Sequence, residues 1–162
     1  MRQETCIIRI LVYGTLKRGQ WNHRFCHHAV DIRPGVVMGR LYHLPAGFPA
    51  IEIPPAAVLA AGTADPVADA ATQAAFAGPD LAMRDAAGNW SKVHGEVITF
   101  PDPARDLPPL DRLEGFHPGG NGLYLRSLVL ARTAAGIEPV WLYHMGQVAH
   151  GKRLPGGNWP AD

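Results

Sequence analysis

Residues that interrupt regular structure recur along this chain and limit what it can fold into. Its 162 residues include 18 glycines and 15 prolines. Proline removes a backbone hydrogen-bond donor, and glycine weakens the interior of a helix or strand. The sequence therefore predicts short strands joined by turns, together with a few short helices.

The apolar segments of the chain have the length and alternation of strands. Five of them cover residues 7–12, 36–42, 92–100, 123–131 and 140–145, and a shorter one covers 50–53. Short helices are expected over 21–29, 67–76 and 107–113, with no repeated strand–helix–strand period. This pattern predicts an α+β fold, a mixed and curled sheet or small β-barrel of about six strands with a few short helices.

One region differs in composition from the rest. Residues 54–91 are rich in Ala, Pro and Gly and are interpreted as an insertion within a single domain that spans 1–162. Asp65 followed by Pro66 is a typical helix start. A surface loop is favoured for this insertion over a lid above a site, because long surface loops tolerate added residues. The segment from Gly146 onward is expected to be a polar tail, mobile around residues 156–157.

The charge and cysteine content exclude several classes of function. The net charge is +1, and no basic stripe is visible in the sequence, so nucleic acid is not an expected partner. No apolar stretch reaches 18 residues, so no membrane span is expected. Cys6 and Cys26 do not form a disulfide framework, which fits a cytoplasmic protein. The sequence predicts no oligomeric state.

The first apolar segment stops abruptly at a glycine. Residues 7–12 run directly into Tyr13, Gly14, Thr15 and Leu16. Glycine permits a tight turn, and successive backbone N–H groups that face one concavity bind anions. The simpler interpretation is a core strand followed by an ordinary turn.

Four segments together carry a resemblance to a known family. Residues 13–24, YGTLKRGQWNHR, resemble the opening of the γ-glutamylcyclotransferase-like family, in particular the branch that includes the γ-glutamylamine cyclotransferases. The family's later elements are similar to VHGEV at 93–97, LDRLEG at 110–115 followed by YLR at 124–126, and WLY at 141–143. The resemblance implies an enzyme that cyclises a γ-glutamyl amine or peptide to 5-oxoproline and releases the free amine. It implies a small-molecule substrate and no cofactor or metal.

The resemblance also implies roles for particular residues. Glu114 would be the catalytic acid/base, because a carboxylate whose pKa is raised by burial can take up a proton and return it. The implied substrate-binding residues are Tyr13, Gly14, Thr15, Leu16 and Tyr143. Glu96 is the competing acid, and Asp111 is expected to form hydrogen bonds within a helix or turn.

Other interpretations stay open. A non-catalytic protein that binds a small anion would use the same scaffold. A metal-dependent hydrolase would use the histidines at 23, 27 and 28, and a cysteine enzyme would use Cys26. The leaving amine is not defined by the sequence: γ-glutamyl-lysine crosslinks, γ-glutamyl amino acids and γ-glutamyl polyamine or drug intermediates all fit.

Overall fold

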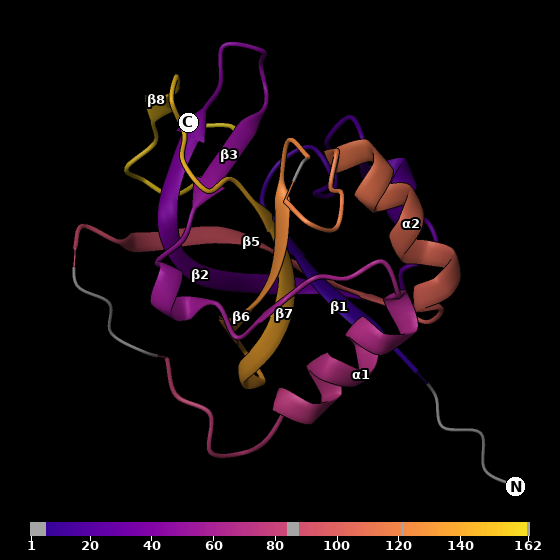
Figure 1. The fold of residues 1–162 in the computed structure, drawn as a ribbon. Helices are drawn as coiled ribbons and strands as arrows, with labels where there is room; N and C mark the ends of the chain where they lie inside the picture. The colour runs from indigo at the N-terminus through magenta and orange to yellow at the C-terminus, as the bar shows by residue number, and fades with distance from the viewer. Residues whose placement is uncertain (1–5, 84–87, 121, 162) are drawn as a thin grey trace, which may run out of the picture.

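Five strands close into a small barrel at the centre of the molecule (Figure 1). The structure is a computed structural model that describes residues 6–83, 88–120 and 122–161. The barrel strands are β1 (Ile8–Val12), β2 (Asp31–His43), β5 (Ser91–Phe100), β6 (Leu125–Thr133) and β7 (Gly136–His144). They follow the order β2-β5-β1-β7-β6, and β6 pairs back onto β2 to close the barrel. Only β1 and β7 are parallel, so the fold is the predicted α+β class with a mixed, closed sheet.

Three shorter strands extend the barrel at its edges. Strand β3 (Pro49–Glu52) pairs with β2, as does β8 (Lys152–Arg153), and β4 (Ala60–Ala61) pairs with β6. The barrel strands and β3 correspond to the six predicted strands. The other two span only two residues each, which is too short to produce a sequence pattern.

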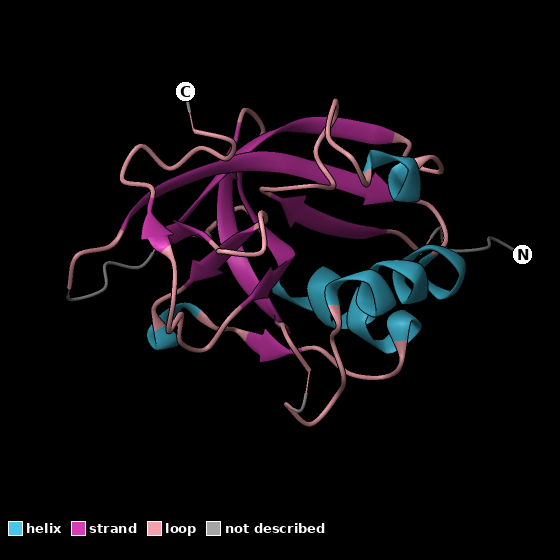
Figure 2. Cartoon of the chain, turned by 90° about the horizontal axis from the view of Figure 1, so that it is seen from above, coloured by secondary structure: helices cyan, strands magenta, loops and turns pink. Residues whose placement is uncertain are grey.

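The two α-helices lie on one side of the barrel (Figures 1 and 2). Helix α1 (Pro66–Phe76) and helix α2 (Pro103–Glu114) contact each other, and α1 also contacts β1 and β7. Two 3₁₀ turns complete the described helical structure, η1 (His23–Cys26) and η2 (Pro55–Ala57). The helix expected over 21–29 is therefore only the short η1. No helix in the described part of the chain is long and apolar enough to cross a membrane.

Strand alternation separates the core into two clusters. Leu11 of β1 packs with Val97 of β5 and Val140 of β7 in the cluster that fills the barrel. Ile10, the adjacent residue, belongs to the cluster that includes Leu107 of α2. Successive side chains of a strand point to opposite faces, so β1 serves both the barrel interior and the helix layer.

Helix α2 starts earlier than predicted. The sequence predicts a helix only over 107–113, but the helix begins at Pro103 and continues through Pro108 and Pro109. Asp102 caps it by accepting a hydrogen bond from the Arg105 N–H. The two internal prolines remove helical hydrogen bonds, and the complete burial of Leu107 and Leu110 offsets that loss.

The described part of the region 54–91, residues 54–83 and 88–91, contacts the barrel more extensively than a surface loop would. It contains helix α1, which confirms the helix predicted over 67–76, with Asp65 as the cap. Gln73 of α1 is buried, and its amide bonds to the Arg9 N–H, the Arg9 carbonyl and the Pro139 carbonyl, each at 2.9 Å. This side chain joins α1 to the adjacent strands β1 and β7.

Two other boundaries differ from the prediction. Strand β2 begins at Asp31 rather than Val36, because residues 31–35 pair with β5 although Pro34 interrupts their pattern. The C-terminal tail is anchored: Trp159 is only 4% exposed, and the Gly157 carbonyl accepts a hydrogen bond from the His94 N–H at 2.8 Å. The tail packs against β5 instead of extending into solvent.

Candidate functional site

A cavity of about 240 Å³ lies where the turn after β1 meets the C-terminal end of α2. Its lining comes from the β1 turn, the segment after the turn, the β3 edge, the end of α2 and the strands β6 and β7 with their flanks. The lining residues are Leu11, Val12, Tyr13, Gly14, Thr15, Leu16, Trp21, Asn22, Phe48, Pro49, Leu113, Glu114, Leu123, Tyr124 and Tyr143. The fold therefore brings Glu114, Tyr143 and all of residues 13–16 to one cavity.

The turn at residues 14–17 is held by its own carbonyl groups. The Gly14 carbonyl accepts from the Lys17 N–H at 3.1 Å, and the Thr15 carbonyl accepts from the Asn22 N–H at 2.9 Å. The Asn22 side chain also donates to the Thr15 hydroxyl at 3.0 Å. The Leu16 carbonyl lies 2.9 Å from the His23 Nδ1 atom.

Three N–H groups of the same turn, unlike that of Lys17, have no partner among the described residues. Within the described part of the chain, those of Gly14, Thr15 and Leu16 donate to no other protein group. A carbonyl and the following N–H point in opposite directions across a trans peptide, so the N–H groups of Thr15 and Leu16 point away from the donors that fix the turn. Consecutive free N–H groups beside a cavity are suited to an anionic ligand.

Gly14 is required because the backbone of the β1 turn lies against the Pro49 ring, not because its φ angle is unusual. A Cβ atom at this position would overlap the Pro49 ring of β3. The Pro49 carbonyl in turn accepts a hydrogen bond from the Tyr124 hydroxyl at 2.6 Å. The glycine therefore lets the β1 turn pack directly on the β3 edge, which forms one wall of the cavity.

Glu114 is the last residue of α2. The helix ends because Gly115 adopts a left-handed conformation, with φ 67°, and caps the last turn. Glu114 remains partly accessible, as a cavity-lining residue must be. Burial by the surrounding protein raises the pKa of its carboxyl to about 7, and no cation among the described residues pairs with it to oppose that shift.

Tyr143 connects the cavity wall to a buried ionic network. Its hydroxyl donates to Asp111 at 2.6 Å, while its backbone carbonyl accepts from the Tyr13 hydroxyl at 2.7 Å. Arg126 is fully buried. Its Nε donates to the Asp111 Oδ1 atom at 2.9 Å, and its Nη1 donates to the Oδ2 atom of Asp69 in α1 at 2.9 Å. Burial and the neighbouring Asp111 carboxylate raise the pKa of Tyr143 well above its ordinary value, so its hydroxyl remains a donor.

This network corrects two expectations. Asp111 forms hydrogen bonds as predicted, but with distant side chains rather than within its own helix. The region 54–91, interpreted from the sequence as an insertion that forms a surface loop, contributes Asp69 to the network that supports Tyr143. No described residue of the insertion lines the cavity.

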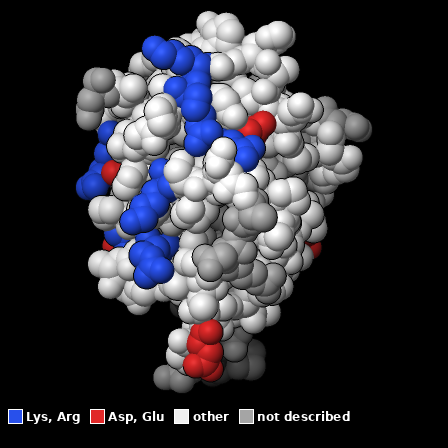
Figure 3. Space-filling view, turned by 90° about the vertical axis from the view of Figure 1, so that its left-hand side faces the viewer, with Lys and Arg blue, Asp and Glu red and all other residues white. Residues whose placement is uncertain are grey.

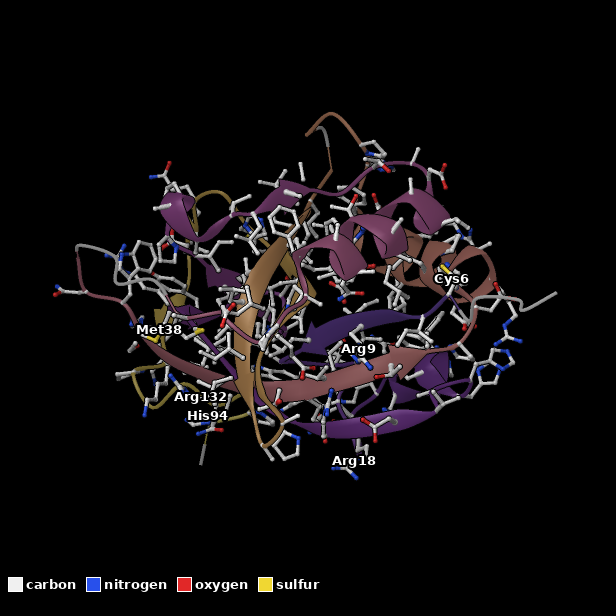
Figure 4. All side chains as sticks on the ribbon, turned by 90° about the horizontal axis from the view of Figure 1, so that it is seen from below. Cys6, Arg9, Arg18, Met38, His94 and Arg132 are labelled. Atoms are coloured by element: carbon white, nitrogen blue, oxygen red, sulfur yellow. The ribbon has the colours of Figure 1, made fainter. Side chains whose placement is uncertain are left out.

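Glu96, the competing acid, lies outside the cavity lining. Its carboxylate accepts from the Arg18 backbone N–H at 2.7 Å and from the Arg18 Nε at 2.9 Å. Figure 4 shows Arg18 at the outer edge of the molecule. Glu96 is therefore occupied by a surface ion pair that fixes the chain just beyond the β1 turn.

The other candidate groups are also engaged elsewhere. His23 and His27 each place Nδ1 2.9 Å from a backbone carbonyl. The described residues contain no group of three or more His, Cys, Asp or Glu side chains that could hold a metal ion. Cys26 is buried, and this burial, reinforced by Glu96 and Glu114, raises the pKa of its thiol to about 12. A thiolate at Cys26 is therefore strongly disfavoured.

The fold gathers cations that the linear sequence separates. Figure 3 shows Lys and Arg side chains in a band on the side where β2, β5 and β8 lie. Met38, Arg40 and Tyr42 share one face of β2, with Lys92 opposite Met38 and Arg153 opposite Tyr42. The expectation that nucleic acid is not a partner stays a prediction.

Several cavity residues were not singled out from the sequence. They are mostly apolar: Trp21, Phe48, Leu113 and Leu123, together with the polar Asn22 and Tyr124. Trp21, Asn22, Leu113 and Tyr124 lie within the segments that carry the family resemblance, and this was the only available signal for them. The apolar residues come from four separate segments and meet only in the folded chain.

Two solved structures share this fold. The YkqA protein from Bacillus subtilis is 19% identical, with a TM-score of 0.56, and the match covers 94% of this chain but 39% of that protein. The protein PH0828 from Pyrococcus horikoshii is 19% identical, with a TM-score of 0.52, and the match covers 94% of this chain and 89% of that one. The chain therefore spans well under half the length of the Bacillus protein. No curated protein matches it in sequence.

A family model matches nearly the whole chain. The family is described as "Gamma-glutamyl cyclotransferase, AIG2-like", and its model matches residues 10–75 and 66–161. The matched ranges contain the β1 turn, Glu114 and Tyr143. The chain thus belongs to the AIG2-like γ-glutamylcyclotransferase family.

Proposed function

We propose that this protein is a γ-glutamylcyclotransferase, which converts a γ-glutamyl amine or peptide to 5-oxoproline and the free amine. The observation that carries the proposal is the placement of two complementary features at one cavity. Glu114 supplies a carboxyl whose pKa is about 7, and the turn at residues 14–16 supplies unpaired backbone N–H groups. Family membership supports this class of enzyme.

In the proposed reaction, Glu114 relays protons from the attacking nitrogen to the leaving nitrogen. Its carboxylate takes a proton from the α-ammonium group of the substrate, and the resulting amine attacks the γ-carbonyl carbon. A new C–N bond closes the five-membered ring, protonated Glu114 gives its proton to the leaving nitrogen, and the bond to that nitrogen breaks. The ring nitrogen then releases its second proton, which the freed amine takes up to become an ammonium group, so charge is conserved and no other reactant is consumed. A pKa near the working pH favours both transfers.

The β1 turn and the surrounding walls position the substrate. The N–H groups of Gly14, Thr15 and Leu16 would bind the α-carboxylate, and the Tyr13 and Tyr143 rings would line the substrate's path. Ring closure within one molecule depends mainly on holding the reacting ends together. The reaction needs no metal or cofactor, and the two free cysteines are consistent with work in a reducing cytoplasm.

The first test is a Glu114→Gln variant assayed for 5-oxoproline release with a panel of γ-glutamyl compounds. The loss of the acid/base should lower kcat by about 10²–10⁴-fold, with stability unchanged or raised. The wild-type kcat/KM should rise with pH through about pH 7, because the free enzyme must have Glu114 ionised.

Glu96→Gln is the matched control, because Glu96 carries the same side chain but is held by Arg18 outside the cavity. This control should keep turnover close to wild type. Full activity in Glu114→Gln, or loss of activity in Glu96→Gln alone, contradicts the proposed role of Glu114. Tight binding of 5-oxoproline with no turnover of any compound would favour the non-catalytic anion-binding alternative.

A further inference from the structure

The cavity contains one charged side chain. Among its described lining residues only Glu114 ionises near neutral pH, and the remainder are apolar, aromatic or neutral polar. In the proposed reaction Glu114 faces the substrate's α-amine, and the turn N–H groups face its α-carboxylate. No lining side chain is left to neutralise a further charge on the leaving amine.

The mouth of the cavity exposes large apolar side chains. Trp21 is 64% exposed, Leu123 is 57% exposed and Leu113 is 37% exposed, and all three line the cavity. Single exposed apolar residues are ordinary on protein surfaces, but several that line one cavity are typical of a ligand-binding groove. In the proposed substrate orientation the glutamyl end is held inside the cavity, so the part of the substrate beyond the γ-carbonyl extends towards these three exposed side chains.

Trp21 is fixed in place although its ring is exposed. It packs edge to face against Trp159, with ring centroids 6.0 Å apart and an interplanar angle of 84°. Trp159 is itself buried: its indole donates to His43 at 3.0 Å, and its carbonyl accepts from the Lys17 ammonium group. The C-terminal tail thus holds Trp21 as a preformed wall, which lowers the entropic cost of binding a ligand against it.

We infer that, if the protein has the proposed activity, its substrate is the γ-glutamyl amide of an apolar amine that carries no further charge. Arylalkyl and branched alkyl amines have this chemistry. Their hydrocarbon part packs against the apolar mouth, whereas an amino acid or lysine at this position would bring an ionised carboxylate or ammonium group to a wall with no partner for it. An unpaired charge beside an apolar surface is unfavourable.

The test compares two substrates that differ by one carboxylate. The phenethylamide of γ-glutamate releases an uncharged aromatic side chain on its amine. The second substrate, γ-glutamyl-phenylalanine, releases the same group with a carboxylate attached. Wild-type kcat/KM for 5-oxoproline release should be at least about tenfold higher for the phenethylamide. Equal or faster turnover of γ-glutamyl-phenylalanine overturns the inference while leaving the cyclotransferase activity established. Release of 5-oxoproline from neither substrate, nor from any other γ-glutamyl compound, refutes the proposed function itself.

A charge placed at the mouth provides the second arm. Leu123→Lys adds a cation beside the leaving group. Because this cation attracts the carboxylate of γ-glutamyl-phenylalanine, the ratio of kcat/KM for the phenethylamide to that for γ-glutamyl-phenylalanine should fall several-fold. Val30→Lys is the matched control, since Val30 is equally apolar, 64% exposed and outside the cavity lining. The control should keep the wild-type preference. An unchanged preference in Leu123→Lys contradicts the assignment of this mouth to the leaving amine.

Discussion

Two acidic residues in the last turn of helix α2 have opposite surroundings. Asp111 accepts hydrogen bonds from Arg126 at 2.9 Å and from the Tyr143 hydroxyl at 2.6 Å. Glu114, three residues later, lines the cavity, and burial alone raises the pKa of its carboxyl to about 7. Burial also raises the pKa of Asp111, but Arg126 and Tyr143 oppose that shift.

The comparison separates a structural carboxylate from a candidate catalytic one. Asp111 gains its partners because it faces the barrel, where the buried Arg126 needs acceptors. Glu114 has no such partner among the described residues, so the free energy of its ionisation lies close to zero near neutral pH, as an acid/base requires. Stability measurements on variants of Arg126, Glu114 and Tyr143 test this difference between the two carboxylates.

Replacing Arg126 with Met should cause the largest loss of stability. Arg126 is fully buried, and its removal would leave the buried Asp69 and the partly buried Asp111 without their shared cation. Breaking one partner of a buried ion pair destabilises a protein by about 3–5 kcal/mol. Urea denaturation of Arg126→Met should show a loss of this size.

Arg33→Met is the matched control for that experiment. Arg33 also forms a close ion pair, at 2.8 Å to Glu138, but its side chain is 28% exposed. Exposed pairs contribute at most about 1 kcal/mol. Similar losses in the two variants would contradict the view that Asp111 depends on a buried partner.

The pH dependence of stability should show the second effect. Unfolded Glu114 releases its proton near its ordinary pKa of 4.5, but folded Glu114 keeps it up to about pH 7. Between these values the folded state binds more protons, so the free energy of unfolding falls as the pH rises. The loss, on the order of 3 kcal/mol, is complete above about pH 7.

Other groups titrate in the same range, so the measurement is the difference between wild type and Glu114→Gln. Urea melts at several pH values from 4 to 8 should give a smaller downward slope in the variant. Parallel slopes for the two proteins would mean that Glu114 ionises normally, and the contrast with Asp111 would be lost.

The sequence predicts the elements that depend on neighbouring residues and misses those that depend on contacts between distant segments. The barrel strands were found because alternation within a segment is local, and α1 was found because Asp65 and Pro66 mark its start. The start of α2 was missed, since the expected helix began at residue 107, whereas Asp102 and Pro103, the same residue pair that marks the start of α1, begin it four residues earlier.

The site shows the same division. Glu114, Tyr143 and the turn at residues 13–16 were predicted from a family resemblance, and the fold places them at one cavity. Their environment was not predictable. Asp69 and Arg126 are 57 positions apart in the chain, and no sequence pattern links them. The apolar mouth likewise exists only after distant segments meet.

Replacing Tyr143 with Phe should cause the smallest loss of stability. Tyr143 lines the cavity beside Glu114 but donates its hydrogen bond to Asp111, so this variant tests directly whether Asp111 acts in the structure or in the reaction. Loss of a hydrogen bond to a charged group costs about 1.5–3 kcal/mol, and the lower end is expected because Arg126 remains bonded to Asp111. The ring is retained, so kcat/KM for 5-oxoproline release should fall by less than about tenfold. Urea denaturation and the turnover assay on the same preparation separate the two readouts. A hundredfold loss of turnover with wild-type stability would place the Tyr143 hydroxyl on the substrate, and Asp111 would then belong to the reacting site together with Glu114.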